Sequence, residues 1–428
     1  MRRVAITGIG VIAPNGIGKD AFWNAIVEGQ SGVSKIESFD ASGLPIQIGG
    51  EVKNFDASSY VPESKHLKVM GRNIRFGLAA AKMAWQDAGI EGDSHDPSRV
   101  GVVMGAGIVP MNLAEIAPLV SRAVNGGNEF SMARFAEAGA ELLNPLWILK
   151  HLPNMLAAHI SIAHNAQGPN STIVTACSAG TQAVGDAFRL IQRGDADVML
   201  SGGADSRLEP LMLVAYNSLG ALSRSPRPPE EVSRPFDRER DGFVMAEGAG
   251  VLVLEELERA RGRGAHVYAE VRGYGTTLDA YGITRPDPSG VGAARSMELA
   301  LKDAGANSDD VNYISAHGTS TRLNDLMETT AVKRVFNSHA RRISLSSIKS
   351  MVGHMIGAAG AVEAAAAALA VESGVVPPTI NLTNPDPACD LDYTPGSARE
   401  MKPRFALVNS FGFGGQNASL VFSHFNGR

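Results

Sequence analysis

The stretch that decides the fold is STIVTACSAGTQAVGDAFRLIQRG, residues 171–194. Apolar and β-branched residues at 173–175 predict a short buried strand. Small residues follow, and apolar side chains then recur at helical spacing until Arg193 and Gly194, which end the predicted helix. Cys177 is therefore expected at a turn from a strand to a helix.

A cysteine at such a turn has two interpretations. At the first turn of a helix a thiolate meets unpaired backbone N–H groups and the positive end of the helix dipole, which would lower the pKa of Cys177. The small neighbouring residues would leave room for a substrate carbonyl. A buried structural cysteine is the alternative, because free cysteines are among the most buried residues. The segment alone leaves both open.

Composition narrows the class of protein. The chain has 428 residues, 44% hydrophobic and 19% charged, as is ordinary for a globular enzyme. A net charge of −5 and the lack of a basic tract argue against nucleic-acid binding. Two cysteines, Cys177 and Cys389, make no disulfide framework and favour a cytoplasmic protein. The most apolar stretch, 358–371, contains Glu363 and predicts a buried helix rather than a membrane span.

A glycine motif near the N-terminus invites a different function. TGIGVIA, residues 7–13, satisfies G-x-G-x-x-A, the dinucleotide-binding fingerprint. Pro14, Asn15 and Gly16 interrupt the segment where a helix should begin, and no acidic residue ends a second strand at the expected distance. Nucleotide binding is therefore not expected.

The rest of the chain alternates strands with helices, which favours an α/β fold with mixed, mostly parallel sheets. Residues 349–374 resemble the Cys177 segment: each combines chemical groups with a small-residue helix that a glycine ends. This weak internal repeat indicates a duplicated fold. We place the boundary in the charged segment near residue 260, giving halves 1–260 and 261–428.

Reactive residue types follow several predicted strands. Cys177, His317, Lys349, His354 and Phe411 all lie in glycine-rich loops after strands. Sites in α/β sheets form at the carboxyl ends of strands. A cysteine can take an acyl group, and two neutral histidines can donate hydrogen bonds to an enolate oxygen. The set therefore suits chemistry through a thioester.

The motifs TACSAG, PFDRERDGFVMAEGAG, AHGTST, KSMVGH-IGAAG and NSFGFGG together resemble the β-ketoacyl-[acyl-carrier-protein] synthase family of the thiolase superfamily. The likeness is to the elongating synthase II type and covers essentially the whole chain. It implies a thiolase-like duplicated fold in five α/β/α/β/α layers. It also implies a homodimer, with a heterodimer as the alternative.

The resemblance assigns roles to residues. Cys177 would accept the acyl group, while His317 and His354 would assist decarboxylation and stabilise the enolate. The backbone N–H groups of Cys177 and Phe411 would form an oxyanion hole, with Phe411 gating the acyl pocket. The remaining positions fall into three groups: Lys349 with its companion Glu363; Asp325 and Glu328 as structural acidic residues; and Thr284, Thr319 and Thr321 as contacts of the phosphopantetheine arm.

The reaction implied is ping-pong. An acyl chain moves from acyl carrier protein to Cys177, malonyl-carrier protein loses carbon dioxide, and its carbanion attacks the acyl-cysteine. No metal or organic cofactor is expected in this step. Because carrier proteins are acidic, the basic segment with Lys65, Lys68 and Arg72 is a candidate docking patch; a solvated helix face is the alternative.

Three positions bear on the acyl chain. Ile108 matches an acyl-pocket position, Trp147 aligns with a pocket-end aromatic contributed across the dimer, and Gln416 stands where threonine is frequent. The hypothesis is a specialised chain, shorter or polyene- or polyketide-like. Two other functions stay open, a catalytically silent partner subunit and a thiol hydrolase or non-condensing acyltransferase.

Overall fold

Eleven strands share one hydrogen-bonded network in the computed structural model, which describes residues 1–61, 64–90, 95–109, 111–124 and 129–427. The strands run in the order β11 (Ser344–Ser346), β10 (Val311–Ser315), β14 (Phe405–Gly412), β15 (Gln416–Ser423), β9 (Ala269–Leu278), β1 (Val4–Ala13), β8 (Gly248–Glu256), β7 (Val198–Asp205), β5 (Val100–Gly105) and β6 (Asn170–Ile173), with β2 (Gly16–Ile17) beside β1. β1 and β9 pair over only three residues, from Val4 to Ile6. This narrow junction joins two five-stranded sheets.

The two sheets repeat one topology. In the first, β1, β8 and β7 pair antiparallel, while β7, β5 and β6 pair parallel. In the second, β9, β15 and β14 pair antiparallel, while β14, β10 and β11 pair parallel. The internal repeat inferred from the sequence is therefore a duplicated fold. The predicted boundary near residue 260 falls in α8 (Leu257–Gly262), between the two sheets, and stays a prediction.

The sheets are mixed, as expected, but the parallel share is smaller than the sequence suggested. Four of the nine neighbouring pairs are parallel and five are antiparallel. Alternating strands and helices predict parallel pairs only where a helix crosses over between neighbours. β14 instead turns directly into β15, and β8 returns beside β7 after a long loop, so the expectation of mostly parallel pairing is wrong.

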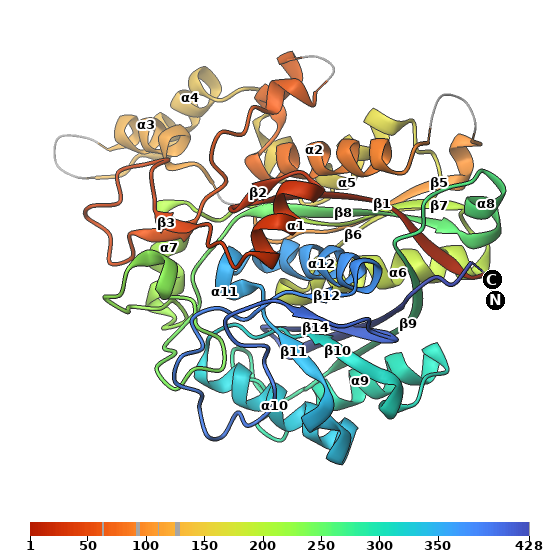
Figure 1. The fold of residues 1–428 in the computed structure, drawn as a ribbon. Coiled ribbons are helices and arrows are strands. Elements are labelled where there is room, and N and C mark those ends of the chain that lie inside the picture. The colour runs from red at the N-terminus through yellow and green to blue at the C-terminus, as the bar shows by residue number, and fades with distance from the viewer. Residues whose placement is uncertain (62–63, 91–94, 110, 125–128, 428) are drawn as a thin grey trace.

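Helices complete five layers, visible from top to bottom in Figure 1. α2 (Arg72–Asp87) and α5 (Met155–His164) cover the first sheet, α6 (Ala179–Arg193) and α12 (Ala359–Ser373) lie between the sheets, and α9 (Val291–Ala304) and α10 (Arg322–Phe336) cover the second sheet. The other elements are α1 (Lys19–Val27), β3 (Val33–Lys35), β4 (Ile48–Gly50), α3 (Leu113–Ala123), α4 (Met132–Leu142), α7 (Pro210–Ser218), α11 (Lys349–Val352), β12 (Val375–Val376) and β13 (Arg399–Glu400).

The central helices are rich in small residues because they touch closely. A Cβ atom on Gly180 of α6 would lie 2.8 Å from the backbone nitrogen of Ala361 in α12. A Cβ atom on Gly360 of α12 would lie 2.0 Å from Oγ1 of Thr181 in α6. Both helices end on a left-handed glycine, Gly194 and Gly374. The duplicated segments are thus packed face to face at the centre of the molecule.

The fingerprint-like glycines near the N-terminus lie within β1 and precede no helix. A Cβ atom on Gly8 would lie 2.1 Å from the carbonyl oxygen of Ala84, and one on Gly10 would lie 1.9 Å from that of Ala80. These glycines let α2 pack against the strand. The glycines therefore have a packing role in this strand, and the expectation that the segment binds no nucleotide stays a prediction.

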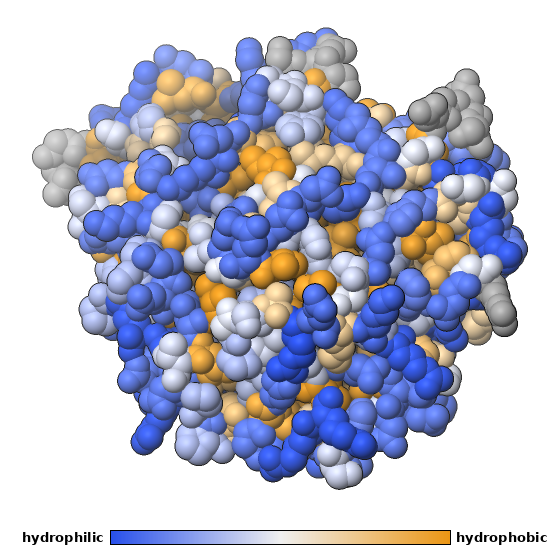
Figure 2. Space-filling model, in the orientation of Figure 1, coloured by the Kyte–Doolittle hydropathy of each residue, from blue (hydrophilic) through white to orange (hydrophobic). Residues whose placement is uncertain are grey.

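The strand before Cys177 is more exposed than predicted, whereas the most apolar helix is buried as predicted. The strand expected at 173–175 is β6, which lies earlier and ends at Ile173. The expectation that it is buried is wrong, because β6 is an edge strand and no further strand in the described residues covers it. The helical segment Ile356–Ser373 is long and apolar enough to span a membrane, but 89% of it is buried between the sheets. The face in Figure 2 is mostly hydrophilic, with apolar residues in small separate patches.

Candidate active site

Cys177 lies at the predicted turn between a strand and a helix. After β6 the chain forms the 3₁₀ turn η5 (Ala176–Ser178) and continues into α6. Ala176 has a φ of 51°, a left-handed conformation that residues with a Cβ rarely adopt. The counterpart turn η9 (Ile356–Ala358) begins with the same conformation at Ile356, with φ 45°. The two sharp turns contact each other, so the start of α12 lies against the nucleophile.

Two histidines from the second half of the chain converge on this thiol. His317 follows β10 and His354 follows α11. The sulfur of Cys177 and one ring nitrogen of each histidine lie within 4.8 Å of one another. His354 Nε2 is 3.1 Å from Cys177 Sγ, and the two imidazole centroids are 5.5 Å apart. The structure therefore brings together the triad that the sequence predicts.

Hydrogen bonds fix the tautomers of both imidazoles. The backbone N–H of Ile356 donates to His354 Nδ1 at 3.3 Å. Lys349 Nζ lies 3.3 Å from His317 Nδ1 and can only donate. Since each Nδ1 accepts, each neutral ring carries its proton on Nε2. His354 thus directs an N–H at the sulfur, and His317 has an Nε2–H donor that the backbone of Phe411 accepts in this structure.

Lys349 is anchored from two sides. Its ammonium group donates to the carbonyl oxygen of His317 at 2.7 Å and forms an ion pair with Glu363 of α12. Both side chains are buried. Burial raises the pKa of Glu363 to about 7, and Lys349 opposes that rise. Lys349 therefore pairs with Glu363, as the resemblance implied. The same ammonium group holds the backbone of His317 in position.

The two acidic residues of α10 hold loops rather than substrate. Glu328 accepts the backbone N–H groups of His317 at 2.9 Å and of Gly318 at 2.8 Å. Burial raises the pKa of Glu328 to about 7, and these N–H donors oppose the rise. Asp325 accepts the N–H of Phe236 at 2.9 Å and pairs with Arg240 at 3.3 Å. Both are structural supports, as the sequence suggested.

The electrostatics of the triad differ from the sequence expectation. Burial raises the pKa of Cys177 to about 11, while the charges of Arg207 and Lys349 act to lower it. The expectation of a lowered thiol pKa is therefore wrong for this enclosed site, because loss of hydration outweighs the neighbouring positive charge. Burial, with Lys349 next, holds the pKa of His317 and of His354 well below the usual range, so both rings are neutral donors.

A cavity of about 420 Å³ reaches the triad from the surface. Its lining includes Cys177, His317, His354, Phe411 and the three predicted pantetheine contacts, Thr284, Thr319 and Thr321. The hydroxyl groups of Thr319 and Thr321 are 2.9 Å apart. The predicted triad and the predicted arm-binding residues therefore share one channel.

Phe411 lines this cavity but does not take the place expected for it. It pairs with Asn417 in the β14–β15 ladder, and its backbone hydrogen-bonds to the His317 ring. The backbone N–H that reaches the sulfur of Cys177 belongs to Phe413. The assignment of the oxyanion donor to Phe411 is therefore wrong by two residues. The N-S-F-G-F-G-G motif contains two equivalent Phe-Gly pairs, and only their register in the strand distinguishes them.

The predicted acyl-pocket residues do not line the cavity that contains Cys177. Ile108 is 61% exposed in the single chain. Trp147 lies in the 3₁₀ segment η4 (Trp147–His151), where its Nε1 donates to Glu115 Oε2 at 2.7 Å. The acyl-pocket role of Ile108 and the contribution of Trp147 across a dimer stay predictions.

The predicted docking residues also lie outside the lining of this cavity. Lys65 and Lys68 are exposed on the 3₁₀ segment η2 (Ser64–Val69). Arg72 makes a bidentate pair with the buried Glu247, at 2.6 and 2.8 Å. This pairing weakens the positive charge that Arg72 can offer to a partner. The docking role stays a prediction.

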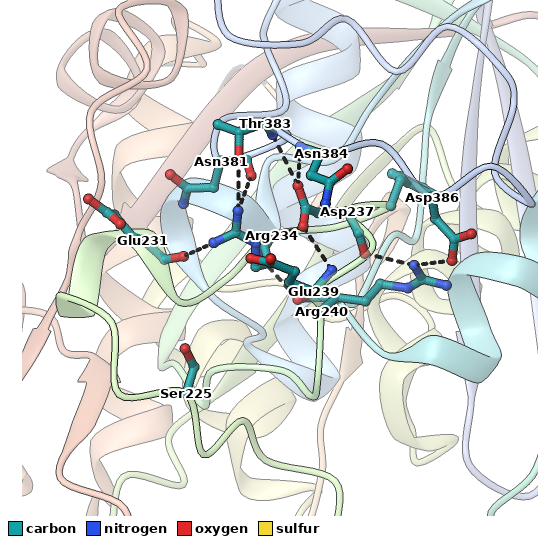
Figure 3. A network of polar contacts seen from close by, with 12 residues as sticks. Ser225, Glu231, Arg234, Asp237, Glu239, Arg240, Asn381, Thr383, Asn384 and Asp386 are labelled. Carbon is teal, nitrogen blue, oxygen red and sulfur yellow. Dashed lines mark hydrogen bonds and ion pairs between the residues drawn. The ribbon is translucent and has the colours of Figure 1, made fainter.

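The PFDRERDG motif forms a polar network with the segment 381–386 (Figure 3). Asp237 Oδ2 accepts the N–H groups of Thr383 and Asn384 at 3.0 and 2.7 Å. Arg240 pairs with Asp386 at 2.7 Å and, as above, with Asp325. The network ties residues 234–240 to α10 and to the segment 381–386, and so fixes the loop that contains His317.

Sequence reasoning missed a buried ion pair beside the nucleophile. Asp205 ends β7, and Arg207 follows it with only 3% exposure. Arg207 Nε donates to Asp205 Oδ1 at 2.9 Å, and Asp205 Oδ2 accepts the N–H of Gly357 at 3.0 Å. The available signal was a pair of opposite charges, D-S-R, directly after an apolar strand.

The triad also meets the distance requirement for a metal site, but its donors suit a metal poorly. Both Nδ1 atoms already accept hydrogen bonds, and both Nε2 atoms carry protons. Lys349 and Arg207 would in addition repel a cation. The expectation of a metal-free reaction stays a prediction.

A duplicated five-layer fold with a buried cysteine and two hydrogen-bond-donating histidines defines an acyltransferase that works through a cysteine thioester. Comparison with known proteins makes this specific. The model of the β-ketoacyl synthase N-terminal domain matches residues 1–260, and that of the C-terminal domain matches residues 268–383. The chain belongs to the β-ketoacyl synthase family and is a condensing enzyme.

The chain is 43% identical to 3-oxoacyl-[acyl-carrier-protein] synthase 2 of Synechocystis, over 99% of this chain and 98% of the relative. It is 43% identical, with the same coverages, to the enzyme of that name from Coxiella burnetii. Among solved structures, it is similar to a ketosynthase bound to a hexaketide in complex with its type II polyketide acyl-carrier protein. That match has a TM-score of 0.87 and 38% identity and covers 99% of this chain and 100% of the other. The structure of the ishigamide ketosynthase/chain length factor matches with a TM-score of 0.87 and 36% identity, over 99% of this chain and 100% of the other.

Proposed function

We propose that Cys177 carries the acyl chain and condenses it with a malonyl group on an acyl carrier protein, giving a 3-ketoacyl-carrier protein. The observation that carries this proposal is the convergence of the Cys177 sulfur and two imidazoles within 4.8 Å at the inner end of one channel. Two neutral Nε2–H donors beside a thiol suit an enolate intermediate better than hydrolysis, which needs a base to activate water.

The first half-reaction loads the cysteine. Sγ of Cys177 attacks the carbonyl carbon of the acyl-carrier thioester, the bond from that carbon to the carrier's sulfur breaks, and the carrier thiol leaves with the proton of Cys177. The backbone N–H groups of Cys177 and Phe413 are the proposed donors to the thioester oxygen. Arg207 and Lys349 favour the transient thiolate, because their charges lower the pKa of Cys177.

The second half-reaction forms the carbon–carbon bond. Malonyl-carrier protein loses carbon dioxide, and the electron pair of the broken bond forms an enolate, whose oxygen accepts the Nε2–H groups of His317 and His354. The enolate carbon attacks the acyl-cysteine carbonyl, the carbon–sulfur bond breaks, and the thiolate of Cys177 takes a proton from solvent. No metal or organic cofactor takes part in the proposed steps.

Intact-protein mass spectrometry and carbon dioxide release test the two half-reactions separately. Cys177→Ala should abolish acylation by acyl-pantetheine thioesters. His317→Ala and His354→Ala should retain acylation but lose about 100-fold or more in carbon dioxide release from malonyl-carrier protein. A mass shift that persists in Cys177→Ala, or carbon dioxide release that survives both histidine substitutions, would refute the assignment.

The partner surface is proposed from an uncovered edge. β6 ends the sheet, and α5 lies against it, with Asn170 Nδ2 donating to Ser161 Oγ at 2.6 Å. Val174 and Ile162 beside this edge are 55% and 76% exposed. An exposed edge strand flanked by apolar side chains favours pairing with an identical strand, so we propose a second copy of this chain as the occupant.

Analytical ultracentrifugation tests this assembly. The wild-type chain should sediment as a dimer, and Val174→Glu with Ile162→Glu should shift it to the monomer. Leu299→Glu, on the partly exposed face of α9, is the matched control and should stay dimeric. A monomeric wild type would exclude the homodimer and favour a heterodimer with a related subunit.

The remaining proposals concern the macromolecular partner and the cellular location. An acidic acyl carrier protein is the proposed macromolecular partner, with Lys65 and Lys68 as docking residues and Thr284, Thr319 and Thr321 along its pantetheine arm. A cytoplasmic location is proposed because both cysteines are free and buried, as a reducing compartment allows.

A further inference from the structure

A charged cluster is buried on the inner side of the nucleophile, away from the channel lining. Arg207 Nε and Nη2 each lie 2.9 Å from a carboxylate oxygen of Asp205, and Nη1 donates to the hydroxyl of Tyr216. The charge of Arg207 acts on both Cys177 and His354. A desolvated cation whose charge acts on the sulfur that carries an acyl chain is unexpected in a site for plain hydrocarbon, because methylene groups cannot accept its hydrogen bonds.

Glycines in two nearby loops lie against the buried ion pair of Arg207 and Asp205. A Cβ atom on Gly107, in the loop after β5, would lie 1.7 Å from Nη2 of Arg207. A Cβ atom on Gly357, in the turn beside Cys177, would lie 3.0 Å from Asp205 Oδ2. Gly107 and Gly357 therefore leave room for the ion pair of Arg207 and Asp205, which a side chain at either position would crowd.

Arg207 lies in the chain between residues that pack with Cys177 and residues that line a second cavity. Leu208, Leu213 and Ile356 pack in one group with Cys177, and Tyr216 packs against them. Ser206, directly before Arg207, instead lines a cavity of about 250 Å³. Charged side chains line much of this cavity: Glu209, Arg72, Arg75, Glu115 and Lys150. Tyr216, the partner of Arg207, thus belongs to the surroundings of the nucleophile, and polar space lies beside Ser206.

Arg207 retains capacity for another acceptor. A guanidinium has five N–H donors, and the contacts with Asp205 and Tyr216 occupy one on each nitrogen. Each Nη atom therefore has a donor left. A carbonyl oxygen on the acyl chain could accept it, whereas a saturated chain in the same place would leave it buried and unpaired.

We propose that Arg207, oriented by Asp205 and Tyr216, selects the acyl group on Cys177 by donating a hydrogen bond to a keto oxygen within the chain. The preferred substrates are then keto-bearing acyl groups, and saturated chains of equal length are discriminated against. This inference rests on the proposed function and names its substrate class. Arg207 is a specificity residue that touches the chain.

The test measures acylation of Cys177 by pantetheine thioesters of octanoate and of 3-, 5- and 7-oxooctanoate, by intact-protein mass spectrometry. In the wild type, at least one oxo compound should react about 10-fold faster than octanoate. Arg207→Gln should reduce that ratio to within about twofold, as expected when the unpaired donor that rejects the plain chain is removed. Arg404→Gln, which removes an exposed arginine paired with Asp310, is the matched control and should keep the wild-type ratio.

The ratio is the informative quantity, because a change in the thiol pKa alters all four rates equally. Tyr216→Phe keeps the ion pair and should lower the ratio less than Arg207→Gln does; it replaces that variant if loss of Arg207 prevents folding. Equal wild-type rates for all four compounds, or an unchanged ratio in the Arg207 and Tyr216 variants, would overturn the inference and leave the proposed function standing. Failure of every compound to acylate Cys177 would refute both.

Discussion

Replacing Lys349 by methionine should separate the two half-reactions. The ammonium group is the donor that keeps His317 Nδ1 as an acceptor and places the ring proton on Nε2. Without it, the proton can move to Nδ1, and Nε2 then offers a lone pair where the enolate oxygen needs a donor. Acylation of Cys177 does not use that donor, so it should be much less affected.

The structure sets the size of the effect. Loss of one donor to a developing oxyanion costs about 10²–10³ in rate, which is the expected fall in carbon dioxide release from malonyl-carrier protein. Lys349 also lowers the pKa of Cys177, but its effect is smaller than that of Arg207, so acylation should fall only a few-fold. Breaking a buried ion pair by removing one partner destabilises a protein by about 3–5 kcal/mol.

The stability that Lys349→Met loses relative to the wild type should increase as the pH rises. Glu363 has a native pKa of about 7 against an ordinary 4.5, so the native state holds its proton more tightly than the unfolded state does. Stability from this group is therefore present at low pH and declines as the pH rises from about 4.5 through 7. Lys349→Met, which removes the compensating cation, should lose more stability relative to wild type at pH 8 than at pH 6.

A paired substitution controls for folding. Lys349→Met combined with Glu363→Gln removes the unpaired carboxylate and should recover much of the lost melting temperature. It should not recover carbon dioxide release, because the tautomer of His317 is still unfixed. Acylation falling as far as decarboxylation in Lys349→Met, or full catalytic recovery in the double variant, would refute the reasoning.

Four further outcomes are expected. Alkylation of Cys177 by iodoacetamide, followed by intact mass, should rise about 10-fold per pH unit up to about pH 11; a plateau below pH 9 would contradict the effect of burial. Glu328→Gln should lower the melting temperature and slow carbon dioxide release more than acylation, since its carboxylate holds the loop of His317; an equal loss of both rates would count against it. Gly10→Ala should destabilise the fold by several degrees in calorimetry, because its Cβ would overlap a carbonyl of α2; an unchanged melting temperature would mean that the helix can shift. Lys68→Glu should raise KM for malonyl-carrier protein and leave malonyl-pantetheine unaffected; equal effects on both substrates would exclude docking there.

Local pattern was enough to predict the two central helices. The helix expected to end at Arg193 and Gly194 is α6, and the small-residue helix expected before Gly374 is α12. The repeat of residues 171–194 in the second half correctly indicated a duplicated fold. These features follow from hydrophobic period and glycine stops, which are properties of neighbouring residues.

The reactive groups could also be chosen from the sequence, but their electrostatics could not. Cys177, His317, His354 and Lys349 lie far apart in the chain, and their motifs predicted one site. The direction of the Cys177 pKa depends on how completely the protein covers the sulfur, which the turn sequence does not encode. A helix N-terminus favours the thiolate, yet burial raises the pKa of Cys177, and this loss of hydration outweighs the charges of Arg207 and Lys349.

What the sequence by itself determined is the class of chemistry: a cysteine, two histidines and a lysine in glycine-rich loops of a duplicated α/β chain. What only the tertiary structure decided is register and proximity. It placed the N–H of Phe413 rather than that of Phe411 at the sulfur, and it set Arg207 behind Cys177. Both depend on contacts between strands and loops distant in sequence. Local periodicity specifies which residues are buried, but only the packed fold specifies which buried residues meet.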